Sequence, residues 1–387
     1  MKHYQHGGST AKRLKHCQAW TAESEGVPKP TTSPFAISGT AIHHLLEMMN
    51  LDDTFDFAKY EGVDFIDRGD KVVFDLDMLT LASDMWHADM DVCKRYAVTE
   101  WEAETTGEFS EFIGSTVDKV GAGTLPDGTK CVVFTDYKSG AGNQVDAVGN
   151  DQLLHNAMTL RKNSTAMDFF EGVDHYVGVI IQPGRDGQVH AKEWQFTKDI
   201  VDQFERTYIG LVQLSEADEP PMAAGDWCQY CPANGLCDAT TGNLLKMAQL
   251  DPKDTENLAW ALDHVSQVKK TIAAVEAMAY QQLEAGVSIV GWKLVRGKPG
   301  NTRWIDPEAA LKRLRRMFGG KRGLVTEKML SPTQALALAK KLDNNAAPII
   351  AELSERPEAT KNTLAPDSDK RPAILSAEAF ATALAKK

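Results

Sequence analysis

Two short apolar segments, each with an aspartate near its end, constrain the fold of this chain more than any other feature. Residues 112–120 and 131–140 are rich in β-branched side chains, and turn-forming residues separate them. We therefore expect two strands joined as a hairpin. Because side chains alternate along a strand, Asp136 and Lys138 should project from one face, where Asp118 of the paired strand can meet them.

Two carboxylates and an ammonium group on one face of a sheet suit a divalent cation and a phosphate. Carboxylate oxygens bind hard ions such as Mg²⁺ or Mn²⁺, and such an ion makes hydroxide from water near neutral pH. A lysine can hold or deprotonate the attacking water. A D-x-K triplet also occurs on ordinary solvated hairpins, so the interpretation depends on other residues.

A histidine and a glutamine flank the hairpin in the sequence. Residues 39–46 open a predicted helix, with Ser38 as its N-cap, and His43 follows the first glycine of this segment by four residues. After a glycine-containing loop, residues 151–157 start another helix, which can bring Gln152 back to the edge of the sheet. A lone histidine is usually structural. The full order of glycine, histidine, two strand aspartates, lysine and glutamine arises by chance much more rarely.

Over residues 39–157 the sequence resembles the RecB-like branch of the PD-(D/E)xK nuclease superfamily. The resemblance implies an α/β, restriction-endonuclease-like fold with a mixed sheet flanked by helices, and it implies metal-dependent DNA cleavage. It also implies a role for each of the residues above: His43, Asp118 and Asp136 as ligands of Mg²⁺ or Mn²⁺, Lys138 as the residue that serves the water, and Gln152 as the residue that orients the site.

Three details of this resemblance stay open. The backbone carbonyl of Tyr137 is a possible further ligand, and His44 competes with His43 for the histidine position. The family usually has a tyrosine four residues after the glutamine, whereas this chain has Asn156. The match is therefore weaker in the helix that carries Gln152.

The cysteines give a second signal. Cys228, Cys231 and Cys237 form a C-x2-C-x5-C loop whose thiolates can converge on one centre, and Cys17 is the candidate for a fourth ligand. The pattern resembles the iron–sulfur staple of RecB-like nucleases, which implies a [4Fe-4S] cluster that ties the two ends of the domain together. Zinc is the rival, because four thiolates suit either centre. A disulfide framework is disfavoured without a secretory signal.

Length and composition predict more than one domain. With 387 residues and 43% hydrophobic content, the chain can bury a full core. We expect a nuclease domain over residues 1–250 and a helix-rich region over 251–387, with a flexible segment near 355–372. The remaining expected elements are helices at 79–104, 198–214 and 257–283 and strands at 175–182 and 189–194.

Charge is unevenly distributed. The formal net charge of -12 argues mildly against a large surface that coats DNA nonspecifically, but it does not describe a local cleft. Basic residues interleaved with tryptophans after residue 290 can follow a nucleic-acid backbone, although a solvated helix face is an equal alternative. The candidate DNA contacts are Lys293, Arg296, Lys298 and Arg303.

The C-terminal segments 291–295, 330–335 and 364–373 resemble a bacteriophage and prophage family of RecB-like proteins. The resemblance implies an exonuclease acting at DNA ends in phage recombination or replication, with a phage single-strand annealing or replication protein as a possible partner. The alternatives are a DNA-end or single-strand binding accessory with little cleavage, and a zinc-stapled structural protein of phage assembly. The sequence contains no apolar run long enough to predict a membrane span. We therefore expect a cytoplasmic protein, which would lie in the host cytoplasm if it is phage-encoded.

Overall fold

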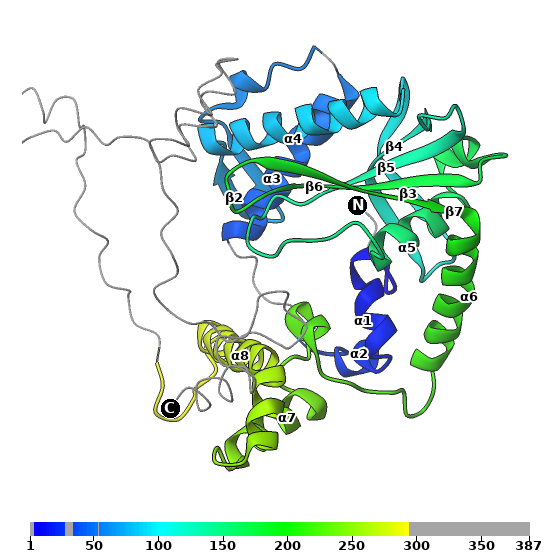
Figure 1. Ribbon diagram of the computed structural model, residues 1–387. Helices are drawn as coiled ribbons and strands as arrows, with labels where there is room; N and C mark the ends of the chain where they lie inside the picture. The colour runs from blue at the N-terminus through cyan, green and yellow to red at the C-terminus, as the bar shows by residue number, and fades with distance from the viewer. Residues whose placement is uncertain (1–3, 28–33, 53, 294–387) are drawn as a thin grey trace, which may run out of the picture. The chain divides into compact units, whose positions relative to one another are not determined.

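The computed structural model describes residues 4–27, 34–52 and 54–293 (Figure 1). By its contacts the chain divides into Met1–Lys298 and Pro299–Lys387, and the second unit lies outside the described residues. The predicted flexible segment at 355–372 lies outside them as well, and the proposed domain boundary at residue 250 stays a prediction. Among the helices of the described ranges, none is both long and apolar enough to cross a bilayer.

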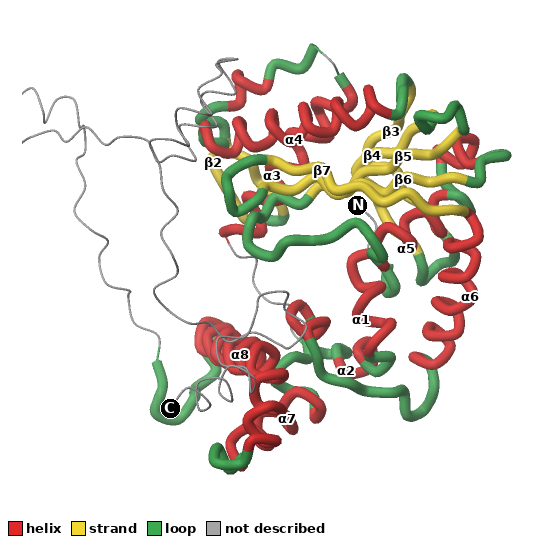
Figure 2. Tube along the Cα trace, viewed as in Figure 1, coloured by secondary structure: helices red, strands yellow, loops and turns green. Residues whose placement is uncertain are grey.

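A five-stranded mixed sheet forms the centre of the first unit, and this confirms the mixed sheet that the resemblance implied. Its strands follow one another in the order of the chain, with the β5–β6 pair parallel and the other three pairs antiparallel. Figure 2 shows the sheet in yellow between helices. The strands are β3 (Glu100–Glu108), β4 (Gly114–Thr124), β5 (Lys130–Tyr137), β6 (His175–Pro183) and β7 (Val189–Thr197).

Helices cover both faces of this sheet (Figure 1). On β5, Val133 packs in the apolar cluster of α3 and α4, whereas Val132 and Phe134 pack in the cluster of α1, α5 and α6. This alternation is what a strand buried on both faces requires. The helices are α1 (Ala11–His16), α3 (Pro34–Leu51), α4 (Leu76–Arg95), α5 (Asp151–Leu160) and α6 (Lys198–Ser215).

The remaining described elements are smaller or follow the cysteine loop. Strands β1 (Asp64–Asp67) and β2 (Asp70–Val73) form a separate antiparallel hairpin. Helix α8 (Thr255–Glu284) confirms the helix predicted at 257–283. The others are α2 (Trp20–Glu23), α7 (Asp238–Gln249) and the 3₁₀ helices η1 (Gly8–Thr10), η2 (Phe57–Tyr60), η3 (Thr165–Phe170) and η4 (Asp226–Tyr230).

Two predicted helix boundaries are wrong. The helix expected over 79–104 ends at Arg95, because Ala97 takes a left-handed backbone conformation (φ 49°) and the chain then enters β3. Ser38 is not an N-cap, since α3 already begins at Pro34. Proline is well suited to a first helical turn, where its missing N–H costs no hydrogen bond.

Candidate active site

The predicted hairpin is β4 and β5, and it brings the two aspartates together. Lys119 pairs with Thr135 in the antiparallel register, so the next position sets Asp118 opposite Asp136. Both carboxylates are largely buried, at side-chain exposures of 14% and 9%. Like charges directly opposite on neighbouring strands repel each other, so this pair requires cationic neighbours.

His43 of α3 supplies one such neighbour. Its Nδ1 lies 3.1 Å from Asp118 Oδ1, and the Tyr137 amide donates a hydrogen bond of 2.6 Å to Asp118 Oδ2. Burial alone would lower the pKa of His43, but the Asp118 carboxylate outweighs it and raises that pKa to about 9. The same contacts outweigh burial at Asp118 and hold the pKa of its carboxyl below the ordinary value.

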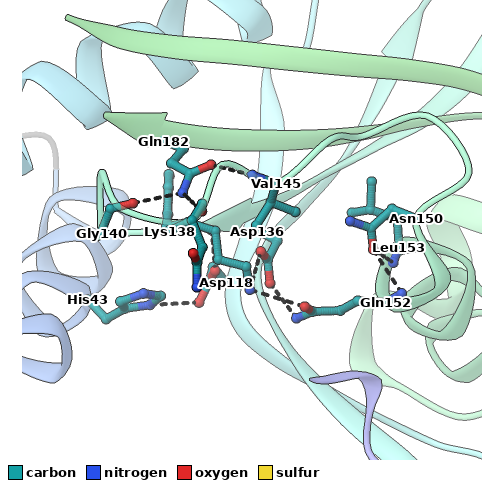
Figure 3. Close-up of polar contacts among 12 residues, drawn as sticks. His43, Asp118, Asp136, Lys138, Gly140, Val145, Asn150, Gln152, Leu153 and Gln182 are labelled. Atoms are coloured by element: carbon teal, nitrogen blue, oxygen red, sulfur yellow. Dashed lines mark hydrogen bonds and ion pairs between the residues drawn. The ribbon is translucent and has the colours of Figure 1, made fainter. Parts of the chain in front are cut away.

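Lys138 and Gln152 surround the second carboxylate (Figure 3). Lys138 Nζ forms an ion pair of 2.7 Å with Asp136 Oδ2, and Gln152 Nε2 donates a hydrogen bond of 2.6 Å to Asp136 Oδ1. Lys138 also donates to Gln152 Oε1 at 3.1 Å. Burial of Asp136, partly opposed by Lys138, raises the pKa of its carboxyl. Asp136 in turn outweighs the burial of Lys138 and raises the pKa of the ammonium group.

Local structure explains why Gln152 reaches the sheet. The Asn150 side chain caps α5 by accepting hydrogen bonds from the backbone amides of Gln152 and Leu153, at 2.9 and 3.3 Å. Gln152 thus stands in the first turn of a fixed helix. Four residues later, Asn156 is buried in the core against Gly8, where an added Cβ would lie 2.7 Å from Asn156 Oδ1.

Glu104 of β3 joins this site, although no motif in the sequence had indicated it. Ligand atoms of His43, Glu104 and Asp118 all lie within 4.8 Å of one another. The β3–β4 register pairs the residues on either side, which sets Glu104 opposite Asp118. Three adjacent strands therefore each present a carboxylate, at Glu104, Asp118 and Asp136. A strand assignment for residues 100–108 would have shown this register, but the helix predicted at 79–104 covers residues 100–104.

Glu104 is unusual in two further respects. Its φ of 50° lies in the left-handed region, which is uncommon for a non-glycine residue inside a strand. Burial, together with the nearby charge of Asp118, raises its pKa to about 7. Strained residues of this kind persist where the surrounding structure holds them, and they concentrate at functional sites.

The donor set fits a hard divalent cation. Carboxylates with an imidazole suit Mg²⁺ or Mn²⁺, and a bound ion would displace the proton that the raised pKa of about 9 leaves on His43. The neighbouring His44 instead lies 3.6 Å from Glu47 and packs against Phe65. Of the two histidines, it is therefore His43 that the structure places beside Asp118, and its role as a ligand stays a prediction.

A second, fully buried polar network supports β4 and β5 from the side of α4. Lys119 Nζ donates to Asp89 Oδ2 at 2.9 Å and lies 4.1 Å from the centre of the Trp101 ring. Thr135 and the Tyr137 hydroxyl also donate to Asp89, at 2.7 and 2.9 Å. Three of these residues are direct sequence neighbours of the site carboxylates, so the network fixes the backbone that carries Asp118 and Asp136.

The four predicted staple cysteines come together. Cys17, Cys228, Cys231 and Cys237 line one small cavity. Among the described residues, no three of these sulfur atoms all lie within 4.8 Å of one another. Burial raises the pKa of Cys228 to about 11. The other two thiols, Cys93 and Cys131, are buried in the sheet core, as packed cysteines should be.

Arg13 supplies positive charge beside the cysteine cavity. Its guanidinium lies over the Trp20 ring at 4.9 Å and donates a hydrogen bond of 3.3 Å to the Trp227 carbonyl. Burial lowers the pKa of Arg13, opposed by the neighbouring thiols of Cys228 and Cys231. A cation at this place would stabilise thiolates that bind a metal centre.

The predicted DNA-contact residues are only partly within view. Lys293 is exposed at the end of the described chain. Arg296, Lys298 and Arg303 lie outside the described residues, so their role stays a prediction.

Comparison with known proteins identifies a family without an assigned activity. Residues 3–372 match the family described as "Protein of unknown function (DUF2800)". A solved structure described as "Crystal structure of SSO0001" is similar at a TM-score of 0.24 and 10% identity, over 62% of this chain and 89% of that chain. That likeness is too weak to support a functional comparison.

Proposed function

The chain belongs to the DUF2800 family, and we propose from the geometry of its site that it is a metal-dependent DNA nuclease. The observation that carries the proposal is the row of Glu104, Asp118 and Asp136 across three strands, with Lys138 beside it. Such a row of partly or fully buried carboxylates is costly without a cation. Surface charges on a solvated hairpin would not be buried or converge in this way.

Each residue has a definable task. His43, Glu104, Asp118 and Asp136 would hold Mg²⁺ or Mn²⁺, which supplies an activated water and neutralises charge on the phosphodiester. Lys138, whose pKa is raised, carries its proton at neutral pH and can donate hydrogen bonds to the water or to a phosphate oxygen. Gln152 bridges Lys138 and Asp136 and keeps both at fixed positions.

The resemblance of the sequence to RecB-like phage proteins extends this proposal to an exonuclease that acts at DNA ends in recombination or replication. An annealing or replication protein of the phage would be its partner. The rival function, a DNA-binding accessory with little cleavage, predicts binding without turnover.

Cleavage of end-labelled DNA tests the proposal. Linear single- and double-stranded substrates would be incubated with Mg²⁺ or Mn²⁺, and with EDTA as the metal-free control. Asp136→Asn and Lys138→Ala should each reduce cleavage at least about 100-fold, because they remove charge at the reacting phosphate. Asp84→Asn, an exposed change on α4, should have no effect.

Circular dichroism and urea midpoints would establish that the variants are folded. Unchanged cleavage by either folded site variant would reject the site. Binding without cleavage by the wild-type protein would favour the accessory function instead.

For the cysteine cavity we propose a [4Fe-4S] cluster. Four thiols from the two ends of the domain line one cavity beside Arg13, and few of the other residues that line it carry a carboxylate. Four thiolates suit such a cluster, and zinc is the competing occupant. The centre would tie α1 to the loop around η4, because Cys17 is far from the other three in sequence.

A further inference from the structure

Tyr230 is an exposed aromatic residue held close to the candidate active site. It is the last residue of η4 and lies between Cys228 and Cys231 in the sequence. Its side chain is 74% exposed, whereas Cys228 is buried. The loop that carries the cysteines thus directs this ring outwards.

The ring contacts the loop that leaves the catalytic strand. Asn143 Nδ2 donates a hydrogen bond of 3.5 Å to the Tyr230 hydroxyl. Asn143 belongs to the segment that connects Lys138 to Gln152, so it lies between two site residues in the sequence. The same segment begins at Lys138, whose side chain forms an ion pair with Asp136 in the site.

This connecting segment is fixed rather than free. The buried Gln182 side chain donates to the carbonyls of Gly140 and Asn143, at 2.7 and 2.8 Å, and accepts from the Val145 amide at 2.9 Å. Figure 3 shows Gln182 between Gly140 and Val145, next to Lys138. Asn143 therefore offers Tyr230 a defined contact.

The surroundings of the segment leave room for a ligand. A Cβ added at Gly140 or Gly142 would meet no atom within 4 Å. An exposed tyrosine ring against the segment that leaves Lys138 suits a nucleotide, because the ring can stack on a base while the ammonium group contacts the phosphate.

We propose that Tyr230 stacks on a nucleobase of the DNA strand whose phosphate lies at Lys138. This inference rests on the proposed nuclease function.

Binding measurements with a cleavage-deficient background test the inference. In Asp136→Asn protein, fluorescence anisotropy would measure the affinity for a single-stranded oligonucleotide, intact or with one abasic site moved along the strand. Tyr230→Ala should weaken binding of intact DNA about 5- to 150-fold, the range expected for loss of one base–aromatic stack. Tyr230→Phe keeps the ring and should remain within about threefold of its parent.

The position of the abasic site gives the specific signature. At one position near the reactive end it should weaken binding by the parent protein but not by Tyr230→Ala, because the stacking partner is already missing. Tyr280→Ala, which removes another half-exposed tyrosine from α8, is the matched control and should leave affinity unchanged.

Photocrosslinking of 5-iodouracil DNA adds a readout that does not depend on affinity or activity. A crosslink to Tyr230 supports the inference. The inference is overturned if every abasic position has the same effect in parent and variant, or if crosslinks form only to other segments. Neither result contradicts the proposed nuclease function as long as the wild-type protein cleaves DNA. If wild-type protein neither cleaves nor binds DNA, the proposed function fails together with the inference.

Discussion

The buried ion pair between Lys119 and Asp89 should be among the most sensitive contacts in the protein. Both side chains are nearly inaccessible, at exposures of 3% and 1%, and their charged atoms lie 2.9 Å apart. Asp89→Asn keeps the shape of the side chain but leaves the Lys119 ammonium without its counterion. Removing one partner of a buried pair costs about 3–5 kcal/mol. That is a large fraction of the total stability of about 5–15 kcal/mol that most domains have.

Urea unfolding at pH 7 measures this loss as a change in midpoint at constant slope. Lys119→Met should cost a similar amount, and the double variant should lose clearly less than the sum, because it leaves no unpaired charge. Lys71→Met is the control: it breaks an exposed pair with Asp64 of 2.6 Å and should cost less than about 1 kcal/mol. If Asp89→Asn is no more destabilising than this control, the network does not hold the strands as we argue.

Two further predictions concern a buried histidine and the cysteine cavity. Burial lowers the pKa of His155 to about 3, well below its ordinary value near 6.5. The free energy of unfolding should therefore carry no penalty from His155 above pH 6.5. It should decrease as the pH falls from 6.5 towards 3, because the unfolded chain then binds a proton at His155 that the folded chain does not bind. In urea titrations His155→Gln should show a smaller loss between pH 7.5 and 5; an unchanged loss would exclude His155 as its source. Protein purified without oxygen should contain iron and absorb broadly in the visible range, and Cys231→Ser should lose both while Cys131→Ala keeps them. Colourless folded protein with stoichiometric zinc would assign the cavity to zinc.

Sequence patterns predicted the elements whose structure is determined by their own residues. The hairpin of β4 and β5 could be predicted because β-branched residues and turn residues agree there, and the period of two placed Asp136 and Lys138 on one face. Strand β3 could not be predicted in the same way, because residues 100–104 contain glutamate, alanine and tryptophan, which also suit a helix. Pairing with β4 overrides that weak preference.

The site shows the same division. His43 and His44 are adjacent in sequence and equivalent as ligands, so only the packing of α3 on the sheet could choose between them. Glu104 became recognisable only once its strand and register were known. The contact between Lys119 and Asp89 joins α4 to β4, and no spacing rule in the sequence connects two such positions.

The arrangement concentrates unfavourable features at one place and rigid support behind it. Glu104 has a strained backbone, and Glu104, Asp118 and Asp136 set negative charges side by side. On the opposite side, Asp89 binds Lys119, Thr135 and Tyr137, the residues next to those carboxylates. A chain that needed only stability would gain by replacing the carboxylates with apolar residues. Retained strain and repulsion, held by a hydrogen-bonded network, are therefore the physical argument for the function proposed at this site.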